Sequence, residues 1–336
     1  FGIQNQQGIL KNNQMDRYTG RMNVTQKFMD DRLSVDVNLN ATYTKNERPP
    51  IGSMLGGAIS TNPTYPAYDA NGAPFKYASG TNPLITLALE KDITTINRVI
   101  GSISPSFKIM EGLVYKLNFG IDNSSSVRDL QSLANAVPLQ DGRLETIYAY
   151  NRNRLVENYV TYSLNKTDYS FSALVGHSYQ KIFLQGRSSS INKFPITSIE
   201  PQYNPGLGQE LTLANNKPGG YALINELQSF YSRVNYQYKD RYLVTATVRA
   251  DGSSKFGANN KYGIFPSFSL GWRISEEAFM KSSAFNELKL RAGWGRTGNQ
   301  EIPSKITQAL FTSQVSASTS YPLFSTGAYP AGTSYS

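Results

Sequence analysis

The chain has 336 residues, with 22 tyrosines, 16 phenylalanines, no cysteine, one histidine and a formal net charge of +9. The absence of cysteine excludes disulfides and thiolate metal sites, and a single histidine excludes a multi-histidine metal site within the chain. No apolar run reaches the roughly 18 residues of a membrane-spanning helix. The basic residues are scattered, many on the polar side of predicted strands, so nucleic acid is not an expected partner.

The first clear element, residues 33–44, alternates strictly between apolar and polar side chains. Every odd position from Leu33 to Tyr43 is apolar, and every even position from Ser34 to Thr44 is polar. Successive side chains of a strand point to opposite faces, so this strand has one apolar and one polar face. A transmembrane β-barrel has such a wall, with strands of about 9–11 residues.

Similar patterns predict ten strands in one antiparallel sheet. In chain order they cover 17–28, 33–45, 94–109, 113–123, 146–165, 169–187, 223–238, 241–251, 263–274 and 287–297. Asn82 followed by Pro83 predicts the start of a short helix between the second and third strands, and residues 276–285 predict a helical turn.

Short and long connections alternate, as they do between the two ends of an outer-membrane barrel. We therefore expect an all-β fold: residues 1–336 as a single partial transmembrane barrel domain. Its long extracellular loops are expected at about 46–92, 124–145, 188–221, 252–262 and 298–336. Aromatic residues near strand ends are candidates for the interfacial girdles of such a barrel: Tyr18, Tyr43, Tyr242, Tyr262, Trp272 and Trp294.

Three further motifs favour ordinary structural roles. The glycine pattern from Gly293 to Gly298 resembles a dinucleotide-binding loop, but the sequence after it does not predict the required helix. Asp69 to Gly72 lacks the later ligands of a calcium loop and predicts an Asx-type turn. His177 lies in phase with apolar strand residues and is predicted to be a girdle or packing residue.

Several segments resemble the SusC/RagA family of TonB-dependent outer-membrane transporters, and together they cover most of the chain. The most specific run comprises 249–257, 260–267, 271–279 and 288–300, and similar segments occur at 17–24, 26–33 and 68–72. The resemblance implies a bacterial outer-membrane barrel of about 22 strands that contacts membrane lipid and encloses a plug. It also implies coupling to TonB, a SusD-like surface lipoprotein as a lid, and import of oligosaccharides or oligopeptides.

The chain is expected to be a middle piece of such a barrel. It begins at Phe1 without a secretory signal, ends at Ser336 in a loop-like stretch, and shows no plug, TonB box or aromatic terminal strand. About ten strands of the barrel are therefore predicted here, with the plug domain absent and TonB contacted through a segment outside this chain.

We expect no catalytic residue, cofactor or metal. The loop candidates for contact with ligand or lid are Tyr65, Tyr68, Phe75, Tyr77, Lys255 and Asn299, because aromatic faces stack on sugars and peptide side chains. The candidates for polar residues facing the lumen are Arg249, Asp251, Lys289 and Arg291. The alternatives are a passive outer-membrane channel or adhesin without TonB coupling, and a soluble all-β carbohydrate-active enzyme or lectin.

Overall fold

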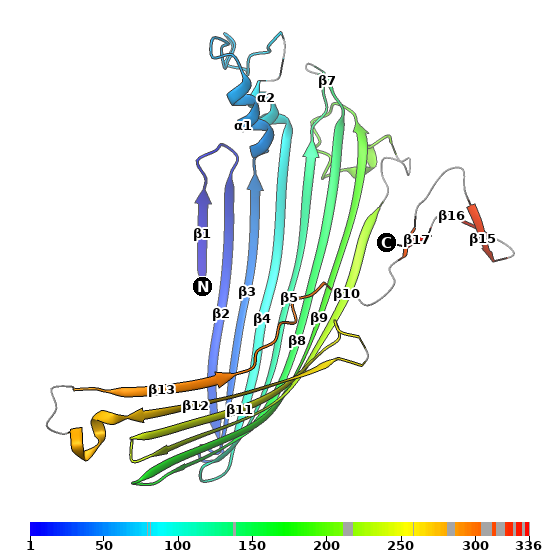
Figure 1. The fold of residues 1–336 in the computed structure, drawn as a ribbon. Coiled ribbons are helices and arrows are strands. Elements are labelled where there is room, and N and C mark those ends of the chain that lie inside the picture. Colours follow the sequence, from blue (N-terminus) through cyan, green and yellow to red (C-terminus); the bar gives the residue numbers. More distant parts are fainter. Residues whose placement is uncertain are drawn as a thin grey trace. The chain divides into compact units, whose positions relative to one another are not determined.

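The computed structural model describes residues 1–78, 80, 82–136, 139–210, 218–257, 259–280 and 286–303, and the backbone of four short strands beyond them. Its main feature is an 11-stranded antiparallel sheet in the order β1-β2-β3-β4-β5-β8-β9-β10-β11-β12-β13 (Figure 1). The strands are β1 (Gly2–Gln7), β2 (Gln14–Phe28), β3 (Leu33–Arg48), β4 (Glu90–Met110), β5 (Leu113–Ser132), β8 (Gly142–Asn165), β9 (Tyr169–Phe194), β10 (Gly219–Tyr238), β11 (Tyr242–Ser253), β12 (Tyr262–Arg273) and β13 (Lys289–Gly295).

Smaller elements complete the described part of the chain. Two-stranded ladders join β6 (Asn135–Ala136) to β7 (Leu139–Gln140), β14 (Phe311–Ser313) to β17 (Thr333–Tyr335), and β15 (Ser320–Phe324) to β16 (Gly327–Pro330). The helices are α1 (Ile51–Ser60) and α2 (Pro83–Leu89), with 3-10 turns η1 (Pro205–Leu207), η2 (Ile274–Glu276) and η3 (Ala278–Met280). None of the helices in the described ranges is long and apolar enough to cross a membrane.

The all-β prediction is confirmed, and the differences concern the ends of the elements. β1 was not predicted, because its sequence GIQNQQ shows no apolar–polar alternation, yet it pairs with β2 along its whole length. β5, β8 and β9 extend beyond their predicted ends, so the connections shorten to 133–141 and 195–218. Backbone pairing continues there although the alternation has ended, because a ladder needs no apolar face.

The connection between β3 and β4 contains both helices. α2 has the predicted cap, since the Asn82 side chain accepts a hydrogen bond from the Leu84 N–H and Pro83 begins the helix. α1 was missed, because its glycines are poor helix formers and Pro50 provides no side-chain cap. The helical turn predicted at 276–285 is present in its first part as the 3-10 turns η2 and η3, and residues 281–285 lie outside the described residues.

The chain divides into two compact units. Unit 1 comprises residues 1–105, 118–155 and 182–224, and unit 2 comprises residues 106–117, 156–181 and 225–336. Strands of the sheet contribute residues to both units, and the alternation of side chains gives each unit an apolar and a polar face. The prediction of a single barrel domain remains a prediction.

The apolar face of unit 1 consists of large side chains that the chain leaves exposed. A Cβ atom at Gly101 would lie 3.4 Å from Ile121 and 3.5 Å from Leu39, which places these three positions of β3, β4 and β5 side by side. Phe119 and Ile121 are 44% and 42% exposed. Among the described residues the only buried hydrophobic side chains are Met54, Leu87, Leu144 and Phe194. A sheet that exposes its apolar face suits contact with lipid.

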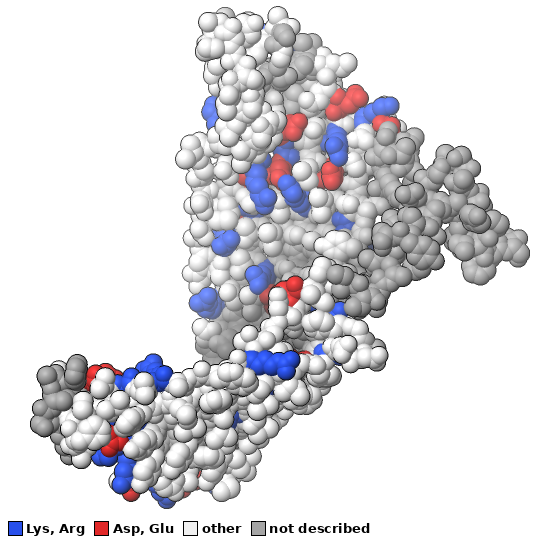
Figure 2. All heavy atoms as spheres, in the orientation of Figure 1, with Lys and Arg blue, Asp and Glu red and all other residues white. Residues whose placement is uncertain are grey.

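The opposite face of unit 1 is held by polar pairs between neighbouring strands. Asn38 donates to Ser102 at 3.4 Å, and Ser104 donates to Asn118 at 2.8 Å. Unit 2 shows the same division, with Phe268 and Trp294 in ring contact at 6.0 Å on its apolar face. In the orientation of Figure 1 the polar face of unit 1 is toward the viewer, and Figure 2 shows acidic and basic side chains interspersed on it.

The short turns of unit 2 adopt left-handed backbone conformations. Gly112, between β4 and β5, has φ +76°, and a Cβ atom there would lie 2.3 Å from the Ser163 carbonyl oxygen, so no other residue fits. Lys239 and Asp240, between β10 and β11, have φ 48° and 54°, as in the primed turns that match strand twist.

Candidate functional site

Three of the four predicted aromatic residues of the β3–β4 connection form one cluster. The Tyr65 and Tyr77 rings lie 5.0 Å apart, and the Phe75 and Tyr77 rings 6.1 Å apart. Tyr68 instead contacts the β1–β2 connection, where the Lys11 Nζ donates to its hydroxyl at 3.3 Å. We call Tyr65, Phe75 and Tyr77 the aromatic cluster; such rings can stack on a sugar or an apolar side chain.

An Asx turn shapes the loop that carries the aromatic cluster. The Asp69 carboxylate accepts hydrogen bonds from the N–H groups of Asn71 and Ala73, both at 2.9 Å, and Gly72 has φ +79°. This confirms the predicted turn. Within the described ranges no group of three or more His, Asp or Glu side chains could hold a metal ion.

Asn82 ties this loop to α2. Its side chain is 1% exposed, and its Nδ2 donates to the carbonyls of Ala67 at 2.9 Å and Phe75 at 3.0 Å while its Oδ1 caps the helix. The sequence predicted the cap but not the two loop bonds, because Ala67 and Phe75 carry no side-chain signal for them. One buried amide therefore holds both the helix start and the backbone of the aromatic cluster.

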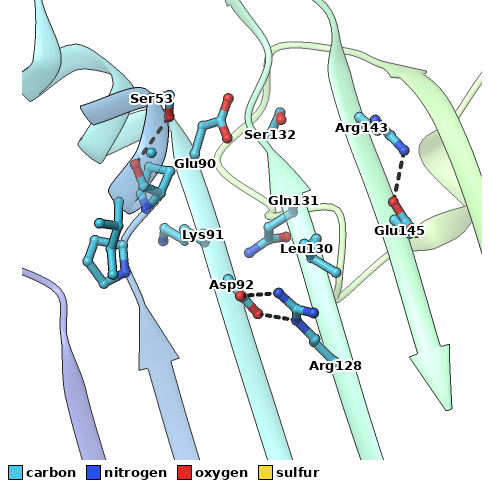
Figure 3. Close-up of a pocket in the computed structure, with 14 residues that line it drawn as sticks. Ser53, Glu90, Lys91, Asp92, Arg128, Leu130, Gln131, Ser132, Arg143 and Glu145 are labelled. Atoms are coloured by element: carbon cyan, nitrogen blue, oxygen red, sulfur yellow. Dashed lines mark hydrogen bonds and ion pairs between the residues drawn. The ribbon is translucent and has the colours of Figure 1, made fainter. Parts of the chain in front are cut away.

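A cavity of about 390 Å³ lies on the polar face of unit 1, between the start of α1 and the ends of β4, β5 and β8 (Figure 3). The Arg128 guanidinium donates to both carboxylate oxygens of Asp92, at 2.8 and 2.6 Å. Arg143 donates to Glu145 at 2.9 Å. This mixed lining offers hydrogen bonds of both kinds to a polar ligand. Sequence reasoning missed it, because the lining comes from separate segments.

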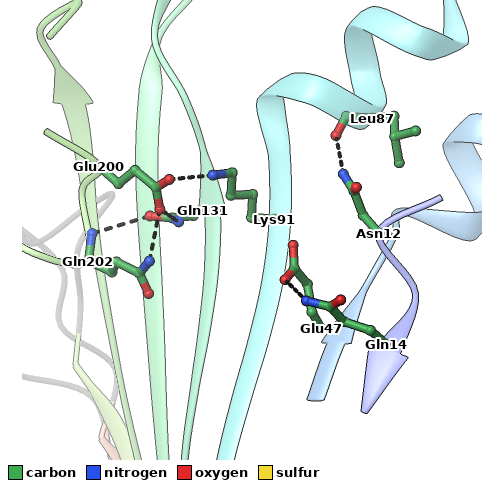
Figure 4. Close-up of polar contacts among 8 residues, drawn as sticks. All are labelled: Asn12, Gln14, Glu47, Leu87, Lys91, Gln131, Glu200 and Gln202. Atoms are coloured by element: carbon green, nitrogen blue, oxygen red, sulfur yellow. Dashed lines mark hydrogen bonds and ion pairs between the residues drawn. The ribbon is translucent and has the colours of Figure 1, made fainter. Parts of the chain in front are cut away.

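A second cluster of polar side chains lies on the opposite face of the same strands and anchors the β9–β10 connection (Figure 4). Glu200 pairs with Lys91 and accepts hydrogen bonds from Gln131 and Gln202, both at 2.8 Å, and the Gln202 N–H donates to Gln131 at 3.2 Å. Lys91 precedes Asp92 on β4, so the two side chains point to opposite faces. Burial raises the pKa of Glu200, but the donors outweigh it and hold that pKa below its ordinary value of 4.5.

Acid is expected to release the β9–β10 connection. Because the folded-state pKa of Glu200 is lowered, its contribution to stability is present above its unfolded pKa and is lost as pH falls through the folded value. In the full receptor, backbone hydrogen exchange of residues 195–210, corrected for the intrinsic rate, should be protected near pH 7 and lose protection below about pH 4.

The variant Glu200→Gln is the control for that release. It stays neutral at every pH, so the same segment should already be less protected near pH 7 and should not change further on acidification. A wild-type segment whose protection does not depend on pH would contradict the role of Glu200.

On the polar face of unit 2, the predicted lumen residues fall into two groups. Arg249 donates to Asp251 at 2.6 Å and to Ser229 at 3.0 Å, and its guanidinium lies 5.7 Å from the centre of the Tyr231 ring. Lys289 and Arg291 lie on the same face of β13, opposite Arg273 and Gly271. The structure therefore brings Arg249 and Asp251 together but does not join them to the β13 pair.

Lys255 and Asn299, which are far apart in sequence, both contact Glu301. The Lys255 Nζ lies 3.5 Å from a Glu301 carboxylate oxygen, and the Asn299 Oδ1 accepts a hydrogen bond from the Glu301 N–H at 2.8 Å. Lys255 has a side chain only 15% exposed, whereas the Glu301 side chain is 80% exposed. Glu301 is thus the residue here that sequence reasoning missed.

The remaining sequence motifs lie in packed or hydrogen-bonded environments that indicate structural roles. The His177 ring packs 4.8 Å from the Phe230 ring and lies 3.0 Å from the Gln228 side chain. Glu277, at the β12–β13 connection, accepts hydrogen bonds from the girdle candidates Tyr242 at 2.6 Å and Trp272 at 3.0 Å. Residues 296–303, after β13, form no helix, so the dinucleotide motif lacks its required context.

Comparison with known proteins shows which proteins this chain is similar to. No family model matches the chain. It is 32% identical over 322 residues to a TonB-dependent receptor of Formosa agariphila, covering 91% of this chain and 31% of that protein. It is 29% identical over 334 residues to the TonB-dependent receptor SusC of Bacteroides thetaiotaomicron, covering 90% and 32%. The chain thus spans about a third of the length of the curated relatives it matches.

Among solved structures, that of the RagAB peptide transporter is similar. The TM-score is 0.78 at 21% identity, with 96% of this chain and 36% of that chain covered, so the fold is shared. An exposed apolar face, a polar opposite face and antiparallel strands are what the wall of such a barrel requires. The chain is therefore a homologue of the SusC-type TonB-dependent receptors and forms part of the wall of an outer-membrane β-barrel.

Proposed function

We propose that the receptor containing this chain imports oligosaccharides or oligopeptides across the outer membrane with energy from TonB. The supporting observation is the match to TonB-dependent receptors over about nine-tenths of the chain, together with the fold of a peptide transporter. The partner is a SusD-like surface lipoprotein that closes over the extracellular mouth.

In this proposal the wall contributes binding rather than chemistry. The aromatic cluster contacts the substrate or the lid, and the cavity beside Asp92 and Arg128 supplies donors and acceptors on the lumen side. Arg249, Asp251, Lys289 and Arg291 face the lumen, and Lys255 and Asn299 belong to the loops. No step forms or breaks a covalent bond in the substrate.

Uptake by cells tests the proposal. A strain that relies on the full receptor for an oligomeric nutrient should lose uptake when tonB is deleted or a protonophore is added. It should also lose uptake when the gene for the lipoprotein is deleted. Uptake that persists without TonB and without a proton gradient would contradict the proposal and favour a passive channel.

Removing the aromatic cluster should weaken binding of the transported oligomer. The double variant Tyr65→Ala/Tyr77→Ala loses two rings that can each pack on the bound oligomer, and an aromatic pair contributes about 0.5–1.5 kcal/mol beyond its buried area. We expect about a tenfold rise in Kd for the full receptor–lipoprotein complex, measured by calorimetry with the nutrient that supports growth. Tyr203→Ala is the matched control, because Tyr203 is 75% exposed and lies in another connection. An unchanged Kd in the double variant would contradict the assigned role.

A further inference from the structure

The apolar face of unit 1 carries arginines where the apolar positions end. A Cβ atom at Gly120, on the polar face, would lie 3.4 Å from the Leu155 Cβ, so Leu155 belongs to the polar face. Its neighbour Arg154 therefore lies on the apolar face, level with Ile121, and Arg152 lies one strand repeat further on.

This level is the boundary between apolar and polar positions. On β5 the apolar face reads Leu117, Phe119 and Ile121, and then continues with Asn123 and Ser125. In an outer-membrane barrel such a change marks the depth at which hydrocarbon gives way to headgroups. Arg152 and Arg154 thus lie at headgroup depth on the lipid side.

Within the described part of the chain, neither of these two exposed arginines has a protein partner. No hydrogen bond or ion pair involves Arg152 or Arg154. By contrast, Arg98 and Arg128 on the polar face each donate twice to one carboxylate. Both guanidinium groups are therefore available to an anion from outside the described residues.

A groove adjoins these arginines along β8. It has a volume of about 380 Å³ and is lined by Tyr148, Tyr150, Arg187, Ser188, Ser189, Pro218 and Gly219. When the Gln185 side-chain amide is oriented with its oxygen toward Arg187, the Arg187 guanidinium donates two hydrogen bonds to that oxygen, at 3.2 and 3.0 Å. Because the amide is neutral, it orients the guanidinium without cancelling its positive charge. Two tyrosine faces beside a guanidinium suit a sugar ring that bears an anionic group.

We propose that Arg152 and Arg154 bind one phosphate of a glycolipid in the outer leaflet and Arg187 a second phosphate of the same lipid, with a sugar ring against Tyr148 and Tyr150. Guanidinium groups bind phosphate oxygens through paired hydrogen bonds, and basic residues at membrane surfaces attract anionic headgroups. This lipid site is separate from the import path, because it lies on the opposite face of the wall.

Native mass spectrometry of the full receptor, purified in detergent from an outer membrane, tests the site. Wild type should retain added bisphosphorylated lipid A about tenfold more strongly than the dephosphorylated lipid, because hydrogen bonds between charged groups are the strong ones. Arg152→Gln/Arg154→Gln should remove that preference, and Arg187→Gln should reduce it.

Two controls keep the test specific. Lys45→Gln removes another exposed cation of the same face. Because the cross-strand neighbour of Lys45 is the acidic residue Asp16, Lys45 is not expected to bind phosphate, and the preference for the phosphorylated lipid should persist in this variant. Heat-modifiable migration on gels confirms that each variant is folded. Equal retention of both lipids by wild type, an unchanged preference in the double variant, or displacement of the lipid by millimolar inorganic phosphate would overturn the proposal.

Discussion

Replacing Asn82 by alanine is expected to loosen the whole loop that carries the aromatic cluster. The change removes the α2 cap and the side-chain donor to the Phe75 carbonyl, and it leaves the Ala67 carbonyl with only the Phe75 N–H as donor. A lost cap costs about 0.5–2 kcal/mol, and each of the two lost loop hydrogen bonds about 0.5–1.5 kcal/mol. Hydrogen exchange of residues 62–77 in the full receptor should therefore rise by about two orders of magnitude.

Asn82→Ser separates the two roles of the side chain. Serine is also a good cap but cannot reach both carbonyls, so α2 should stay protected while the loop exchanges faster. If Asn82→Ala leaves the exchange of the loop unchanged, the amide does not hold the aromatic cluster in place.

Placing an arginine at position 39 is expected to impair insertion of the barrel into the membrane. Leu39 lies on the apolar face beside Gly101 and Ile121 and is 38% exposed. An arginine on the lipid side costs about 2–4 kcal/mol at the middle of the bilayer and about 0–1 kcal/mol at an interface, so at position 39, beside the boundary level of Ile121, we expect about 1–2 kcal/mol. Folding of the full receptor Leu39→Arg into lipid vesicles, followed by gel shift across a urea series, should show a loss of that size.

Asn40→Arg is the matched control, one residue along the same strand. Asn40 lies on the polar face, where Thr42 donates to its side chain at 3.5 Å, so an arginine there can remain in water. Its folding midpoint should stay close to that of wild type. Equal losses in the two variants would mean that β3 does not separate lipid from water.

The strands could be predicted because a wall between lipid and water imposes a period of two on every spanning strand. The same reasoning explains the errors. β1 shows no apolar–polar alternation, and neither do residues 124–132 of β5 or 188–194 of β9, so hydrogen bonding continues there without a pattern in the side chains.

The candidate site was only partly predictable for a related reason. Composition indicated an aromatic loop, and local chemistry indicated the Asn82 cap and the Asp69 turn. The convergence of Lys255 and Asn299 on Glu301, and the pairing of Arg128 with Asp92, depend on which strands lie side by side. A single sequence does not specify those pairings.

The assignment of one face of the sheet to lipid and the other to water underlies the proposed import function, the lipid site and the variants Leu39→Arg and Asn40→Arg. Spin labelling tests this assignment most directly. This chain contains no cysteine, so single cysteines can be placed one at a time from 34 to 43 in the full receptor, with any cysteine elsewhere replaced. Nitroxide labels at odd positions should relax with oxygen dissolved in lipid, and labels at even positions with a water-soluble nickel complex. Strict alternation is the result that we predict, and equal access of the nickel complex to both sets of positions would contradict the account.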